Sequence, residues 1–221
     1  MCNSLSDTNN KIKVLLVDDH AVVRAGFKLL LSTSDNIEVI AEADCGEQAI
    51  QLATRYQPDI IVLDLSMPGI GGLETIKRLV NRDNKVNILV FSVHNEQVYV
   101  NRAINAGAKG YITKSSAPEI LPDAIGHIYN GHCYIEQGLL KETEKSPVES
   151  DYQQIIKAFS SREFDIFRLL AQGYSAHKIA DELCLGYKTI ANYMTQIKKK
   201  LHVSNTPELV HIAILLGRIN H

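Results

Sequence analysis

Two stretches of sequence decide the fold: I-K-V-L-L-V-D-D at residues 12–19 and I-I-V-L-D-L-S-M-P-G at residues 60–69. Each begins with a short run rich in Val, Ile and Leu and reaches a carboxylate at the end of that run. Nearly continuous apolar runs of this length are typical of strands that are buried on both faces of a parallel sheet. Each run is followed by a segment with helical spacing, which indicates consecutive strand–helix units.

The same alternation continues through residues 11–130. The predicted strands are Ile12–Val17, Glu38–Ala41, Ile60–Leu65, Ile88–Phe91 and Gly110–Ile112, and the predicted helices are Ala21–Leu31, Glu47–Tyr56, Leu73–Val80, Glu96–Ala106 and Pro118–Asn130. Five strand–helix units with right-handed crossovers predict an α/β doubly wound, five-stranded parallel sheet.

Polar side chains stand where these strands end. They are Asp18 and Asp19 after the first strand, Asp64 at the third, Ser92 after the fourth and Lys114 after the fifth. Ligand sites in such sheets lie beyond the carboxyl ends of the strands, so we expect these side chains to converge. Clustered carboxylates repel one another and favour a hard cation such as Mg²⁺. Taken singly, each Asp is also a common helix N-cap, Lys114 a solvated loop residue and Ser92 a turn residue.

A carboxylate can also attack phosphorus, and a metal, a hydroxyl and a Lys would then neutralise the phosphoryl oxygens. His20 and His94 stand beside these residues and raise the alternative of a transition-metal site, whereas the carboxylates favour a hard cation. The four cysteines lie far apart, which excludes a disulfide scaffold and a Cys-rich zinc site.

The charge of the chain is unevenly divided. The overall net charge is −2, with −3 in residues 1–135, −3 in residues 136–154 and +4 in residues 155–221. A basic C-terminal part is suited to a polyanionic partner. We expect a disordered tail at residues 1–10, one domain at 11–135, a flexible linker at 136–157 and a second domain at 158–221.

The chain is expected to stay in the cytosol. No apolar run approaches the roughly 20 residues of a membrane span. The polar first ten residues also lack the layout of a signal peptide.

The second domain has purely helical periodicity. Ser160 and Glu163 form a capping box, Ser175 can cap a second helix, and a third helix is expected from about Lys188 to Leu201. A last helix opens at Thr206-Pro207 and runs through Leu216. Two short helices joined by a tight turn predict a helix-turn-helix unit. The exposed face of the third helix suits the major groove, and it also suits a solvated helix in an ordinary bundle.

Residues 11–131 resemble the receiver domain of bacterial response regulators. The motifs are V-L-L-V-D-D-H (14–20), D-I-I-V-L-D-L-S-M-P-G-I-G-G-L-E (59–74), I-L-V-F-S-V-H (88–94) and A-G-A-K-G-Y-I-T-K (106–114). The resemblance implies the flavodoxin-like strand order 2-1-3-4-5. It also implies these roles: Asp64 as phosphoacceptor, Lys114 as its counter-ion, Ser92 and Tyr111 as switch residues, and Asp18, Asp19, Asp64 and the Ser66 carbonyl as the Mg²⁺ site. Ser115 departs from the Pro that is frequent after this Lys.

Residues 158–218 resemble the LuxR-type helix-turn-helix of the NarL/FixJ family. The matching stretches are residues 160–193, with R-E, A-Q-G, I-A and K-T-I in order, and K-K-L-H-V at 199–203. The expected DNA-binding residues are Lys188, Thr189, Ala191, Asn192, Thr195, Lys199 and Lys200. We expect the three lysines to contact phosphates, and Asn192 and Thr195 to lie nearer the base edges. Gly186, Ala191 and Tyr193 depart from the usual Ser, Lys and His.

Together the two resemblances imply a two-component transcription regulator that is not an enzyme. A sensor histidine kinase would phosphorylate Asp64 with Mg²⁺, and a homodimer joined through helix 208–216 would bind inverted half-sites in double-stranded DNA. One alternative is a Mg²⁺-dependent phosphohydrolase, but Asp18-Asp19-His20 lacks the D-x-D arrangement such enzymes usually carry. The other is an adaptor whose second domain binds only protein.

Overall fold

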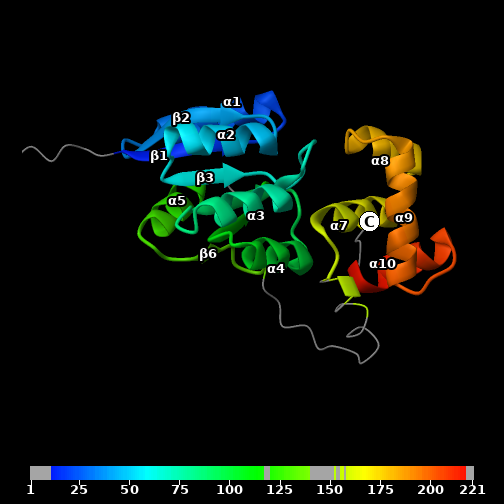
Figure 1. The fold of residues 1–221 in the computed structure, drawn as a ribbon. Helices are drawn as coiled ribbons and strands as arrows, with labels where there is room; N and C mark the ends of the chain where they lie inside the picture. The colour runs from blue at the N-terminus through cyan, green and yellow to red at the C-terminus, as the bar shows by residue number, and fades with distance from the viewer. Residues whose placement is uncertain (1–10, 117–119, 140–151, 153–154, 157, 218–221) are drawn as a thin grey trace, which may run out of the picture.

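The fold consists of a parallel sheet flanked by helices and a separate group of helices beside it (Figure 1). The computed structural model describes residues 11–116, 120–139, 152, 155, 156 and 158–217, without the side chains of 213–217. The predicted tail at residues 1–10 and most of the predicted linker lie outside the described residues. No helix in the described part of the chain is long and apolar enough to cross a membrane.

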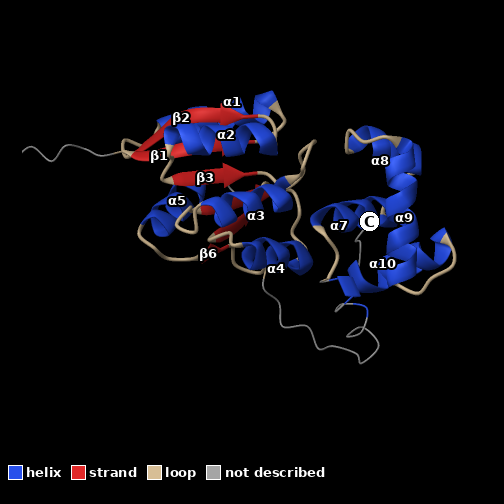
Figure 2. Ribbon diagram, in the orientation of Figure 1, coloured by secondary structure: helices blue, strands red, loops and turns tan. Residues whose placement is uncertain are grey.

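The sheet has the order β2-β1-β3-β4-β5-β6, and every pair of neighbouring strands is parallel. Figure 2 shows its strands in red among the blue helices. The strands are β1 Ile12–Val17, β2 Ile37–Ala43, β3 Ile60–Leu63, β4 Ile88–Ser92, β5 Gly110–Thr113 and β6 Tyr134–Ile135. The helices among them are α1 Ala21–Ser32, α2 Gly46–Tyr56, α3 Gly72–Arg82, α4 Gln97–Ala106 and α5 Ile120–Tyr129. The doubly wound order 2-1-3-4-5 is therefore confirmed.

The sequence predicts five strands, and the sheet has a sixth, β6, at its edge. β6 adds a two-residue strand beside β5, with Gly110 opposite Tyr134 and Tyr111 opposite Ile135. A strand this short has no readable alternation in the sequence, and it forms only because the edge of β5 offers unpaired backbone groups.

Two apolar clusters cover the two faces of the sheet. Successive residues of a strand point to opposite faces, so Leu15 and Val17 join the cluster under α2, α3 and α4, while Val14 and Leu16 join the cluster under α1 and α5. This burial on both faces is the reason why the strands read as continuous apolar runs. It also leaves the carboxyl ends of the strands as the place for polar side chains.

The second part contains α7 Ser161–Ala171, α8 Ala176–Glu182, α9 Tyr187–Lys200 and α10 Thr206–Gly217. The predicted capping box is present: Ser160 Oγ accepts from the amide of Glu163, and the Glu163 carboxylate accepts from the amide of Ser160. Ser175 caps α8 by accepting from the amide of Lys178. These caps satisfy amides that a helix leaves without partners, and they fix where each helix begins.

Glu163 also holds α9 in place. Its buried carboxylate accepts from the Lys200 ammonium at 2.7 Å. Burial alone would raise the pKa of Glu163, but the hydrogen bonds from Lys200 and Ser160 outweigh it and lower the pKa. The ionised carboxylate thus stabilises the fold above its unfolded pKa, and this contribution disappears as the pH falls through the folded pKa.

We expect Glu163→Ala to lower the free energy of unfolding by about 1–2 kcal/mol, because it removes a cap and an ion pair. Glu163→Gln is expected to lose less at neutral pH, since Gln can still cap. Urea unfolding at pH 7 and at pH 3 measures both variants. The gap between the wild-type chain and Glu163→Gln should shrink from pH 7 to pH 3, because the pH falls toward the lowered pKa of Glu163. A gap of unchanged size would contradict the role of the charge.

The ends of the predicted flexible linker at 136–157 are packed rather than free. Leu139 and Ile156 are buried in the same apolar cluster as α4 and α7. Glu136 accepts from the amide of Thr113 at 2.7 Å. The acidic composition of residues 136–154 concealed these anchor points, since single apolar residues in a polar stretch carry no periodic signal.

Candidate functional site

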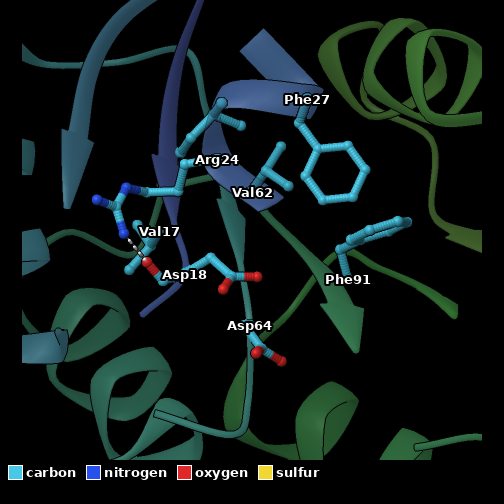
Figure 3. A pocket seen from close by; sticks show the side chains of 8 residues that line it. Val17, Asp18, Arg24, Phe27, Val62, Asp64 and Phe91 are labelled. Atoms are coloured by element: carbon cyan, nitrogen blue, oxygen red, sulfur yellow. Dashed lines mark hydrogen bonds between the residues drawn. The ribbon is translucent and has the colours of Figure 1, made fainter. Parts of the chain in front are cut away.

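Three charged side chains meet beyond the carboxyl ends of β1, β3 and β5. Asp18 follows β1, Asp64 follows β3 and Lys114 follows β5. The Lys114 ammonium donates to Oδ2 of Asp64 at 2.8 Å and also to Oδ2 of Asp18. Figure 3 shows the two carboxylates close together at the end of the pocket, where Arg24 donates to the Asp18 carbonyl at 2.6 Å. Residues far apart in the sequence therefore form one pocket.

The environment of Asp64 opposes its charge. Its side chain is 2% exposed, and this burial raises the pKa of Asp64, while the Lys114 charge acts in the opposite direction. Burial alone would lower the pKa of Lys114, but the charge of Asp64 and the hydrogen bonds to both carboxylates raise it. The two charges thus depend on each other, and Lys114 is the group that keeps an ionised carboxylate in this pocket.

Asp19 lies beside the pocket with an unsatisfied oxygen. Its Oδ1 is buried and has no hydrogen-bond partner among the described residues, although His20 Nδ1 lies 2.9 Å away. The ligand atoms of Asp18, Asp19 and His20 lie within 4.8 Å of one another. The amide of Ser66 donates to Oδ1 of Asp64 at 3.2 Å, which places the backbone of Ser66 at the same pocket.

Ser92 ends β4, and Tyr111 lies in the neighbouring strand β5. Both side chains are fully buried. Ser92 Oγ accepts from the amide of His94 at 3.4 Å, and the Tyr111 hydroxyl donates to the carbonyl of His94 at 2.8 Å. Burial raises the pKa of Tyr111. The two residues predicted as a switch, Ser92 and Tyr111, therefore both bond to the backbone of His94.

His94 has a structural role that the sequence did not reveal. Its Nε2 lies 2.8 Å from Ser66 Oγ, and its ring stacks on Tyr99 with centroids 4.2 Å apart. Burial lowers the pKa of His94 to about 3, so the ring is neutral. His94 does not join the Asp18, Asp19 and His20 cluster, and it connects the loop after β3 with α4 instead.

The predicted DNA-binding residues lie along one side of α9. Ala191 is partly exposed. The other six are exposed: Lys188, Thr189, Asn192, Thr195, Lys199 and Lys200. Opposite them, Ile190 and Ile197 are fully buried against the other helices of this part. A helix with one buried apolar stripe and one exposed polar and basic face is what entry into a major groove requires.

Comparisons with known proteins agree with this arrangement. The family description "Response regulator receiver domain" matches residues 14–126, and "Bacterial regulatory proteins, luxR family" matches residues 157–213. The chain is 38% identical to the transcriptional activator protein ExaE of Pseudomonas putida over 92% of this chain and 96% of that protein. It is 35% identical to the response regulator UvrY of Escherichia coli K12, over 95% of this chain and 96% of that protein.

The chain is a NarL/FixJ-family response regulator. A solved structure of RcsB from Salmonella enterica serovar Typhimurium, bound to promoter rprA with the phosphomimetic BeF3⁻, is 25% identical and aligns with a TM-score of 0.62 over 92% of this chain and 98% of that chain. Proteins of this family are DNA-binding transcriptional regulators and not enzymes, so the phosphohydrolase alternative is set aside.

The two domains of this response regulator touch through α4 and α7. Arg102 of α4 donates to the carbonyls of Ile156 and Phe159 at 2.9 Å and of Ser160 at 3.3 Å. Its guanidinium also lies 4.1 Å from the ring centroid of Phe164 in α7. One side chain of the receiver domain thus holds the start of the DNA-binding domain at several points.

Aromatic rings continue this contact back toward the pocket of Asp18 and Asp64. Tyr99 stacks on His94 and meets Phe164 edge-on, with the Tyr99 and Phe164 centroids 5.1 Å apart. Gly71, in the loop after Asp64, has φ +75°, and a Cβ there would lie 3.3 Å from Oδ2 of Asp165 in α7. The receiver domain therefore packs against α7 and leaves exposed the face of α9 that carries the predicted DNA-binding residues.

Proposed function

We propose that phosphorylation of Asp64 by a sensor histidine kinase controls DNA binding by this response regulator. The observation that carries the proposal is the position of Asp64: a buried carboxylate at a strand end, held by Lys114 and by the amide of Ser66. These donors lie where the oxygens of a transferred phosphoryl group would need neutralisation.

In the proposed transfer, a carboxylate oxygen of Asp64 forms a bond to phosphorus while the P–N bond of the donor phosphohistidine breaks. The electron pair of that bond returns to the imidazole of the kinase. Lys114, which already donates to Asp64, would then hold a phosphoryl oxygen, and Ser92 would turn toward another. Positioning and charge neutralisation are the main contributions that a protein makes to this reaction.

The pocket fits Mg²⁺. The unsatisfied Oδ1 of Asp19 and an oxygen of Asp18 would provide hard ligands of the kind that this ion prefers. Asp64 and the Ser66 carbonyl would supply the others. Mg²⁺ would compensate for the repulsion between the carboxylates and neutralise the phosphoryl oxygens. The His20 side chain is 65% exposed, more than those of Asp18 and Asp19. The oxygen-rich set of ligands favours Mg²⁺ over a transition metal.

Mg²⁺ is expected to stabilise the native chain. At a concentration tenfold above the dissociation constant, binding to the folded state adds about 1.4 kcal/mol and raises the melting temperature by a few degrees. Thermal unfolding with and without Mg²⁺ measures this shift. Asp19→Asn should abolish it, while Asp35→Asn, at an exposed site away from the pocket, should keep it. An undiminished shift in Asp19→Asn would contradict the assignment of Asp19.

The proposed switch runs from the pocket to the contact between the domains. A turn of Ser92 toward the phosphoryl group would disturb the His94 backbone, to which Tyr111 donates. Because His94 stacks on Tyr99 and Tyr99 meets Phe164, a shift there alters the packing of α7. Receiver and DNA-binding domain would then separate or reorient, and the free energy of the phosphoryl contacts shifts the population between these states.

This contact is suited to a switch because it is not fully satisfied. Burial raises the pKa of Asp165 to about 7, against the opposing charges of Arg162 and Arg102. Among the described residues, the Tyr99 hydroxyl and Arg162 Nη1 are buried without hydrogen-bond partners. Each such group costs about 1–3 kcal/mol, which offsets part of what Arg102 and the aromatic rings contribute. A modest change at the pocket is then sufficient to release α7.

DNA recognition is proposed for the exposed face of α9. Lys188, Lys199 and Lys200 would contact phosphates, although Lys200 is also engaged by Glu163 in this structure. Asn192 and Thr195 would reach the base edges, with Thr189 and Ala191 beside them. Thr195 Oγ1 donates to the carbonyl of Ala191 at 2.9 Å, so in this conformation it is left to accept from a base amino group.

We propose that the protein binds inverted half-sites as a homodimer joined through residues 208–216 of α10. Leu209 and Ile212 of this helix are buried within the domain, so the dimer contact has to use the other side of α10. The side chains of 213–216 lie outside the described residues. Two-fold symmetry of the protein would be mirrored in the two half-sites.

Capture of sheared genomic DNA by the purified protein tests the proposal as a whole. Bound fragments are sequenced after incubation with Mg²⁺, with and without beryllofluoride as a phosphoryl mimic. We expect a motif of two inverted half-sites that is enriched with the mimic. Equal enrichment without the mimic would contradict Asp64 as the switch, and no enrichment in either condition would favour the protein-binding adaptor.

A further inference from the structure

An exposed aromatic pair lies at the junction of α8 and α9. The rings of His177 and Tyr187 stack with centroids 4.3 Å apart and an angle of 17° between their planes. His177 is exposed, and Tyr187 is 50% exposed. Neither residue belongs to the DNA-binding set that the sequence predicts, and neither side chain has a hydrogen-bond partner among the described residues.

Tyr187 extends the DNA-binding face of α9. It is the first residue of the helix and stands four residues before Ala191 and eight before Thr195. Residues four apart on a helix lie above one another, so Tyr187 continues the same stripe toward the N-terminal end. Through the stack, His177 brings α8 into the same surface.

Lysines flank the pair in sequence, and the nearest acidic residue along the chain, Asp181, stands four residues after His177. Lys188 follows Tyr187 and is exposed, and Lys178 follows His177 and lies 3.9 Å from the ring centroid of Tyr174. No acidic residue is adjacent in sequence to either ring. Stacking occupies one face of each ring and leaves the polar edge, a hydroxyl in one case and ring nitrogens in the other, available to an outside acceptor.

We propose that His177 and Tyr187 form a rigid part of the DNA interface, in which the Tyr187 hydroxyl and a ring N–H of His177 donate to backbone phosphates beside the groove that α9 enters. This inference rests on the proposed DNA binding and adds α8 to it. Phosphates are the appropriate acceptors because the first helix of a helix-turn-helix unit crosses the backbone, while the second reads the bases.

Phenylalanine variants separate a DNA contact from a purely structural stack. Tyr187→Phe and His177→Phe keep an aromatic ring in the stack and remove only the donors. Binding of the full-length chain, with Mg²⁺ and beryllofluoride present, to a fluorescent, 30-base-pair duplex of mixed sequence is measured by anisotropy at several salt concentrations. Phosphate contacts are independent of sequence, so this duplex reports them without a known operator. Tyr129→Phe and His132→Phe in the receiver domain serve as matched controls, since both residues are exposed there.

Each of the two variants is expected to weaken binding about tenfold, the effect of losing one hydrogen bond to a charged acceptor. A plot of the logarithm of the binding constant against the logarithm of the salt concentration should have the same slope for Tyr187→Phe as for the wild-type chain. The reason is that loss of a neutral hydroxyl changes no counterion release. Lys188→Ala should lower the magnitude of this slope by about one, because one phosphate contact is lost. Melting temperatures and the two control variants should match the wild-type chain.

Wild-type affinity in both phenylalanine variants would overturn the inference. The inference also fails if only Tyr187→Ala and His177→Ala weaken binding, because the pair would then merely support α9. Absence of DNA binding by the wild-type chain would be a different result, and it would overturn the proposed function together with this inference.

Discussion

Asp64→Asn is expected to abolish phosphoryl uptake from acetyl phosphate in the presence of Mg²⁺. The amide has the size of the carboxylate but lacks the anionic oxygen that would attack phosphorus. Asp18 keeps its bond to Lys114, so the pocket retains a partner for the ammonium. Intact-protein mass spectrometry measures the phosphorylated fraction after fixed times.

Asp35→Asn is the matched control, because it makes the same chemical change at an exposed site away from the pocket. It should be phosphorylated like the wild-type chain. Phosphorylation of Asp64→Asn at unchanged stoichiometry would refute the assignment of the phosphoacceptor, and Asp18 or Asp19 would then have to be considered.

Arg102→Ala is expected to release the DNA-binding domain from the receiver domain. The substitution removes three hydrogen bonds to carbonyls and the contact with the Phe164 ring. The loss in docking free energy is on the order of 2–4 kcal/mol. Since several polar groups at this contact lack partners, the docked state should no longer predominate. Small-angle scattering should show a larger radius of gyration, and DNA binding without beryllofluoride should increase.

Arg55→Ala provides the control for this experiment. Arg55 also lies over an aromatic ring, at 5.2 Å from the Tyr56 centroid, but it belongs to α2, away from the domain contact. Its scattering curve should match that of the wild-type chain. An unchanged radius of gyration in Arg102→Ala would show that this side chain does not hold the domains together.

Much of the fold could be predicted because the strands carry a strong local signal. Ile12–Val17 was predicted with its observed bounds, whereas the strand predicted as Ile60–Leu65 ends at Leu63. Leu65 continues the apolar pattern beyond Asp64 but lies outside the strand, and its carbonyl accepts from the amide of Gly72 at 3.1 Å. Two-residue β6 and the buried ends of the linker had no periodic pattern to read.

The site was predictable to the extent that it follows from topology. Asp18, Asp64 and Lys114 come together because parallel strands end at one edge of the sheet, and this holds without knowledge of any side-chain conformation. The links from His94 to Tyr99 and from Arg102 to Phe164 depend on how two domains pack. Such contacts between distant parts of the chain leave no spacing or composition signal, so only the structure reveals them.

The most direct measurement is a DNA-binding isotherm for a fragment recovered by genomic capture, recorded with and without beryllofluoride, for the wild-type chain and for Asp64→Asn. Beryllofluoride should tighten binding of the wild-type chain at least tenfold, the equivalent of about 1.4 kcal/mol. It should leave the isotherm of Asp64→Asn unchanged. An equal increase in both proteins, or no increase in either, would contradict control of DNA binding through Asp64.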